Sequence, residues 1–142
     1  METFYKILQT AVEGMASDIH LKVDGPVIFR INRQLVAIQA PTPNEEWINK
    51  IVDTIVPRHA RVRLDTDREV DFSYHLPGVG RFRTNVYQQK GQWCLSMRHV
   101  KTIVPNFEEL NLPPILKSFA EIPRGIILVS GTTGCGKSTT LA

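Results

Sequence analysis

The sequence has 142 residues and a formal net charge of +3, with 42% hydrophobic and 22% charged residues. This composition is typical of a globular chain with a real core, and the length predicts one domain and part of a second. The mild, scattered charge argues against nucleic-acid binding, the two cysteines exclude a disulfide framework, and no apolar run approaches the ~18 residues of a membrane span.

The first forty residues predict a helix followed by a meander of three strands. Apolar residues recur at helical spacing over residues 3–15, and Gly14 could close this helix with a left-handed cap. From residue 17 the pattern alternates, which puts Asp18 and His20 on one strand face. These two could suggest a metal or acid–base pair, but no third ligand is near, so a solvated strand face is favoured.

The next sixty residues predict two helices and three more strands. Residues 42–45 (Thr-Pro-Asn-Glu) are typical of a capping box that opens a helix ending at Pro57, and a shorter helix is expected over 58–64. Alternating apolar and polar residues then predict strands over 70–76, 81–86 and 93–100. Residues 1–100 therefore predict an α+β domain with an antiparallel sheet and flanking helices.

Arg81 and Arg83 stand out on the second of these strands. Their spacing of two places both side chains on one face. They could pair with Glu69, Asp71 or solvent, or they could form a fork for phosphate, because guanidinium groups match phosphate oxygens bidentately. Both interpretations stay open at this point.

The last part of the chain predicts a linker and the start of a second domain. Residues 101–112 lack periodicity and contain Pro105, so we interpret them as the linker. The second domain would occupy residues 113–142, where Pro113 and Pro114 could start a short helix. The aliphatic run 126–129 is typical of a strand buried on both faces.

A phosphate-binding motif follows that run directly. Residues 131–138 fit G-x-x-x-x-G-K-[ST], in which glycines let backbone N–H groups curl around an anion. Lys137 suits the β- and γ-phosphates, and the Ser138 hydroxyl suits Mg²⁺. We therefore predict binding of ATP and Mg²⁺. The predicted nucleotide contacts are Gly131, Thr132, Thr133, Gly134, Cys135, Gly136, Lys137, Ser138 and Thr139.

Several stretches together resemble the secretion ATPases of type IV pilus and type II secretion systems, and the pilus retraction branch of twitching motility in particular. Residues 17–21 (Ser-Asp-Ile-His-Leu) are similar to the family's entry strand, and 80–86 to its Gly-Arg-Phe-Arg-x-Asn strand. Residues 110–113 (Leu-Asn-Leu-Pro) resemble its interdomain linker, and 124–142 its phosphate loop, the Walker A motif. Cys135 stands where family members more often have Ser.

The resemblance implies a fold and an activity. Such proteins are cytoplasmic homohexamers with a PAS-like N-terminal domain and a RecA-like ATPase domain, docked at an inner-membrane platform protein of the pilus machine. Membrane association would run through partners only. Arginines of the N-terminal domain reach the nucleotide, which carries over to Arg81 and Arg83. The family's Walker B and other acidic residues have no counterpart up to Ala142, so this chain is expected to be an N-terminal piece that is inactive alone.

Three functional hypotheses follow. The first is a motor ATPase that powers pilus retraction. The second is an accessory or regulatory subunit of the pilus machine with little turnover. The third is a type II secretion or pilus-extension ATPase, which a downstream four-cysteine metal site would favour.

Overall fold

The computed structural model describes residues 1–101, 105–132 and 134–141. The chain divides into two compact units, Met1–Lys101 and Thr102–Ala142, and the structure defines each unit by itself. Thr133 of the predicted phosphate loop and residues 102–104 of the predicted linker lie outside the described residues.

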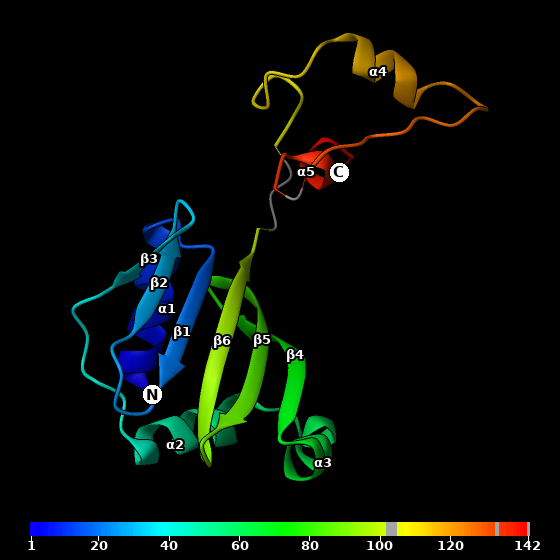
Figure 1. The fold of residues 1–142 in the computed structure, drawn as a ribbon. Coiled ribbons are helices and arrows are strands. Elements are labelled where there is room, and N and C mark those ends of the chain that lie inside the picture. Colours follow the sequence, from blue (N-terminus) through cyan, green and yellow to red (C-terminus); the bar gives the residue numbers. More distant parts are fainter. Residues whose placement is uncertain (102–104, 133, 142) are drawn as a thin grey trace. The chain divides into compact units, whose positions relative to one another are not determined.

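The first unit is built on a six-stranded antiparallel sheet with the order β3-β2-β1-β6-β5-β4 (Figure 1). Its helices are α1 (Glu2–Glu13), α2 (Glu45–Ile55) and α3 (Arg58–Asp67). Its strands are β1 (Asp18–Lys22), β2 (Ile28–Ile31), β3 (Gln34–Ala37), β4 (Glu69–Leu76), β5 (Gly80–Gln89) and β6 (Gln92–Val100). The N-terminal meander and the later three strands thus join into one sheet through β1 and β6, and the predicted antiparallel sheet with flanking helices is confirmed.

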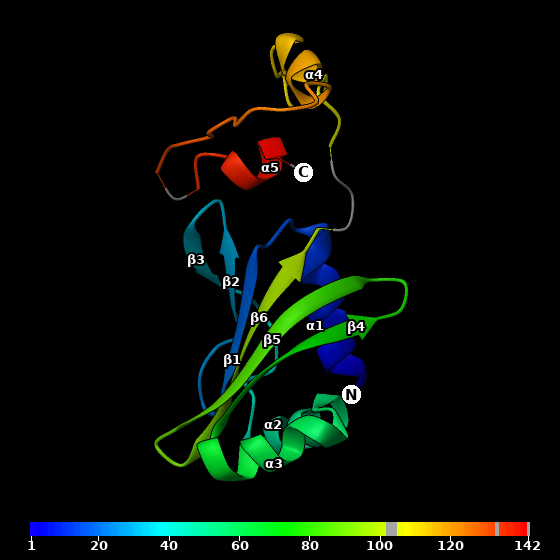
Figure 2. The ribbon, with the colours of Figure 1, turned by 90° about the vertical axis from the view of Figure 1, so that its right-hand side faces the viewer.

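The core lies between one face of this sheet and the helices. Figure 2 shows α1 and α2 behind the sheet, which leaves the other face uncovered by helices. Alternation along the strands sends apolar side chains to the helix face, where Phe82 and Met97 are fully buried. Phe4 of α1 and Ile51 of α2 pack into the same cluster. The polar residues between them therefore stand on the open face.

Two predicted helix caps are wrong. After α1, Gly14 has a φ of −80° and Met15 adopts the left-handed conformation with a φ of 54°. Met15 is also 84% exposed, so the apolar stripe of α1 ends earlier than predicted. For α2 the N-cap is Asn44, whose side chain accepts a hydrogen bond from the backbone N–H of Trp47 at 2.9 Å. Asn is as good an N-cap residue as Thr. The helix therefore begins at Glu45, two residues after Pro43, which was the predicted first position.

The second unit contains two short helices, α4 (Ile115–Ala120) and α5 (Lys137–Leu141). The strand predicted over residues 126–129 is wrong for this chain by itself. Among the described residues nothing pairs with it, and Ile126 and Leu128 are each 87% exposed. A strand without ladder partners leaves its backbone groups to water, whatever its side-chain pattern.

Candidate functional site

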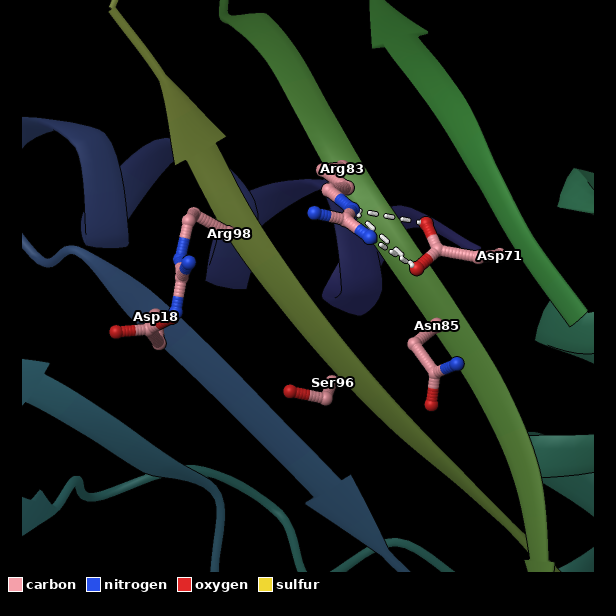
Figure 3. A pocket seen from close by; sticks show the side chains of 6 residues that line it. All are labelled: Asp18, Asp71, Arg83, Asn85, Ser96 and Arg98. Atoms are coloured by element: carbon pink, nitrogen blue, oxygen red, sulfur yellow. Dashed lines mark hydrogen bonds and ion pairs between the residues drawn. The ribbon is translucent and has the colours of Figure 1, made fainter. Parts of the chain in front are cut away.

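The open face of the sheet carries a polar depression of about 150 Å³ (Figure 3). Its lining residues come from β1, β4, β5 and β6, and their side chains stand on the side of the sheet away from α1. They are Asp18, Asp71, Arg83, Asn85, Ser96 and Arg98. The depression therefore brings together groups that lie as far as 80 residues apart in the chain.

The strand register explains why these groups meet. Asp18 of β1 pairs with Arg98 of β6, and Arg98 pairs in turn with Arg83 of β5. Two like charges directly opposite each other destabilise a sheet. A carboxylate on each flanking strand offsets this repulsion, because Asp18 accepts from Arg98 and Asp71 accepts from Arg83.

Asp18 is the buried member of the set, so the predicted solvated face is wrong for this residue. Its carboxylate lies 2.9 Å from Arg98 Nε and 3.2 Å from Arg30 Nε, and the Ser17 hydroxyl donates to it at 2.8 Å. Burial by itself would raise the pKa of Asp18, but the Ser17 hydrogen bond and the two arginine charges outweigh it, and the pKa is lowered. Asp18 is therefore ionised near neutral pH and bridges Arg98 and Arg30.

Asp71 holds Arg83 in a more exposed pair. Arg83 donates from Nε at 3.1 and 3.2 Å and from Nη2 at 2.8 Å, and these bonds raise the pKa of the Arg83 guanidinium. This is one of the two interpretations left open by the sequence. Arg81 lies on the same face, opposite His75 of β4, and forms no ion pair with a described residue.

His20, on the same strand as Asp18, has one hydrogen-bond partner among the described residues. Its Nδ1 lies 3.3 Å from the Ser96 hydroxyl, and its buried Nε2 has no hydrogen-bond partner among the described residues. Burial lowers the pKa of His20, and Arg30 lowers it further against the opposing charge of Asp18. Within residues 1–101, 105–132 and 134–141, no group of three metal-ligating side chains comes together.

In the second unit the glycine-rich loop folds around Lys137. The ammonium group of Lys137 donates to the carbonyl oxygens of Gly131 and Thr132, each at 2.8 Å. Gly134 and Gly136 have φ values of 81° and 98°, which glycine adopts without the strain of a Cβ. The Lys137 ammonium is thus held by backbone carbonyl oxygens of the loop, and the glycines give this backbone the conformational freedom that a phosphate-binding loop needs.

The other predicted contacts lie along the same loop and the start of α5. Cys135 is an exposed free thiol, and its Sγ would collide with a Cβ at Gly131, at 2.6 Å. Ser138 and Thr139 are exposed at the first turn of α5. Both side chains are therefore accessible to solvent.

Sequence reasoning missed part of the depression. The strand pattern does not join Asp18 to Arg98, because nothing in it tells which strands pair. The signal that could have joined them is charge complementarity on alternating positions of two polar strand faces. Asn85 and Ser96 gave no signal of their own beyond lying on the polar face.

The chain therefore combines an antiparallel α+β unit with a glycine-rich loop whose sequence fits the motif of phosphate-binding loops. The sequence matches the family described as "Type II/IV secretion system protein" over residues 1–142, and the chain belongs to that family. This match confirms the resemblance to secretion-system proteins that the sequence motifs indicated. No described helix combines the length and the apolar character needed to cross a membrane.

Individual proteins that resemble this chain in sequence or structure are pilus ATPases and a twitching motility protein. The chain is 33% identical over 137 residues to the type IV pilus retraction ATPase PilT of Pseudomonas aeruginosa, covering 96% of this chain and 40% of that protein. A twitching motility protein of Neisseria gonorrhoeae is 37% identical over 115 residues, 81% of this chain and 31% of its own. The crystal structure of the pilus retraction motor PilT with bound ADP superposes with a TM-score of 0.82 at 36% identity, over 96% of this chain and 40% of that one. The chain thus spans 31–40% of the length of these relatives.

Proposed function

We propose that this chain is the N-terminal part of a motor ATPase that binds and hydrolyses ATP to power type IV pilus retraction. The single observation that carries the proposal is the glycine-rich loop with Lys137 at its centre, in a chain of the secretion ATPase family. The likeness to retraction ATPases over nearly the whole chain supports the retraction role.

The proposed roles follow from the chemistry of each group. Backbone N–H groups of the loop and the Lys137 ammonium would bind the β- and γ-phosphates, and Ser138 would hold Mg²⁺, which offsets phosphate charge when bound. In the proposed step, water attacks the γ-phosphate in line with the leaving oxygen. Arg81 and Arg83 would then offset the charge that develops on the transferring group.

The domain organisation and assembly belong to the same proposal. Residues 1–100 would be the PAS-like domain, 101–112 the linker and 113–142 the start of a RecA-like domain. The division of the chain into compact units at Lys101 supports the boundary between the first domain and the linker. The full-length protein would be a cytoplasmic homohexamer at the inner-membrane platform of the pilus machine.

The test is ATP hydrolysis by the longer protein that carries this sequence, with Lys137→Ala beside it. Lys137→Ala removes the charge at the loop centre, and we expect it to abolish turnover while the protein stays folded. Lys137→Arg is the matched control for charge alone, because its planar fork does not reproduce the compact ammonium. Wild-type turnover no higher than that of Lys137→Ala, alone or with the platform protein, would reject the motor and favour an accessory subunit. A four-cysteine metal site downstream would favour extension or type II secretion instead.

A further inference from the structure

The later part of the predicted linker, residues 106–112, forms a hydrogen-bonded turn that is capped at its start. The Asn106 side-chain oxygen accepts a hydrogen bond from the Glu109 N–H at 2.8 Å, and the Glu109 carboxylate accepts one from the Asn106 N–H at 2.9 Å. This reciprocal pair is a capping box, which satisfies two backbone donors together. The Leu110 N–H donates to the Asn106 carbonyl at 3.1 Å, as in one turn of an α-helix.

The same turn is also capped at its end. Asn111 adopts the left-handed conformation with a φ of 51°. Its N–H donates to the Glu108 carbonyl at 3.1 Å, and the Leu112 N–H reaches back to the Phe107 carbonyl at 3.0 Å. These two bonds with a left-handed residue between them make a Schellman motif, in which Asn is one of the residues tolerated besides glycine.

Side-chain contacts tie this turn to α4, which follows it in the chain (Figure 1). The Lys117 ammonium of α4 lies 2.7 Å from the Glu108 carboxylate and 5.7 Å from the centre of the Phe107 ring. The hydrogen bond from Lys117 lowers the pKa of Glu108. Pro113 and Pro114 join the turn to α4, and their rings fix φ in the connection. Residues 106–120 therefore form one continuous arm inside the second unit.

We propose that this arm is a preformed rigid segment, which stays folded while the two domains of the longer protein move relative to each other. The movement rests on the proposed function, whereas the preformed turn does not. A hinge is a set of a few residues that absorb large changes in φ and ψ. Such changes within residues 106–112 would break the capping box or the Schellman motif and would leave backbone groups unpaired. Residues outside the arm would therefore take up the movement.

The test is amide hydrogen exchange, followed by mass spectrometry, over residues 106–120 of the longer protein without nucleotide and with Mg-ADP. We expect the amides of Leu110, Asn111 and Leu112 to exchange at least about tenfold more slowly than in an unstructured chain, since all three are hydrogen-bonded. The protection should be the same in both states.

Two pairs of variants separate the caps from other effects of substitution. Asn106→Ala removes the N-cap and should speed this exchange about fivefold, whereas Asn106→Asp caps equally well and should not. Asn111→Val places a β-branched residue at a positive φ and should speed exchange by about fivefold or more, whereas Asn111→Gly should preserve the protection.

Exchange at the unstructured rate in the nucleotide-free protein would overturn the preformed turn, as would Asn106→Ala behaving like Asn106→Asp. Protection that is lost when Mg-ADP binds would place the hinge within the arm and overturn its rigidity. Exchange at residues 134–139 that Mg-ADP leaves unchanged would instead count against the proposed nucleotide site. The nucleotide-free measurement would still decide whether the turn is preformed.

Discussion

Asp18→Asn is the substitution that most directly probes the open face of the sheet. The Asp18 side chain is only 9% exposed, and its carboxylate bonds to Arg98 and Arg30. A hydrogen bond to a charged group contributes about 1.5–3 kcal/mol to stability. The two arginine side chains are 66% and 37% exposed, so water screens both, and we expect Asn to cost about 2 kcal/mol in the free energy of unfolding. For a unit of ~100 residues this lowers Tm by about 8–16 °C.

The assay is thermal unfolding followed by tryptophan fluorescence. The chain has two tryptophans, Trp47 and Trp93, and both lie in the first unit, so the signal reports on that unit alone. Asp71→Asn is the matched control, because it removes the carboxylate of an exposed pair and should lower Tm much less.

The stability that Asp18 contributes should decrease in acid. The pKa of Asp18 is lowered in the folded state, so its contribution is complete above the ordinary value of 3.8 and is lost as the pH falls through the lowered value. The gap in Tm between wild type and Asp18→Asn should therefore be constant near neutral pH and close below about pH 4. A variant that melts within 2 °C of wild type (about the size of an exposed substitution), or a gap that widens in acid, would refute the reasoning.

Further predictions concern three other parts of the first unit and the loop. The pKa of His20 is lowered from 6.5, so its imidazole should titrate below 6.5 when followed by NMR. The stability that neutral His20 contributes should be lost as the pH falls through that lowered pKa. A titration midpoint above 6.5 would contradict this. Asn44→Ala should cost about 1 kcal/mol in chemical denaturation, whereas Asn44→Ser should keep the cap. A thiol reagent at neutral pH should label exposed Cys135 quickly and Cys94 only on unfolding, since burial raises the pKa of Cys94; equal rates for both would reject this.

The sheet shows what the sequence could predict. Alternation along β4, β5 and β6 was enough to find all three strands and to place Arg81 and Arg83 on the polar face, because period-2 patterning is a local property. The pairing of β1 with β6 was not predictable in this way. It joins Asp18 to Arg98 across 80 residues, and only the packed core decides which edges meet.

The region around the glycine-rich loop shows what local sequence patterns cannot predict. The motif at residues 131–138 is a local signal, and around it Gly134 and Gly136 have positive φ values while Lys137 donates to the Gly131 carbonyl. The aliphatic run before it carries the pattern of a buried strand without the neighbours that would make it one. Strand formation depends on partners, so composition alone mispredicted residues 126–129.

The central claim is the proposal that ATP turnover depends on the arginines of the open sheet face as well as on Lys137 of the glycine-rich loop. The most direct measurement is ATP turnover by the longer protein with Arg81→Ala/Arg83→Ala, next to wild type and Lys137→Ala, each checked for folding and oligomeric state. We expect both variants to lose turnover while they remain folded and assembled. Wild-type turnover that Arg81→Ala/Arg83→Ala leaves unchanged would contradict the claim, and would leave these arginines without a role in turnover.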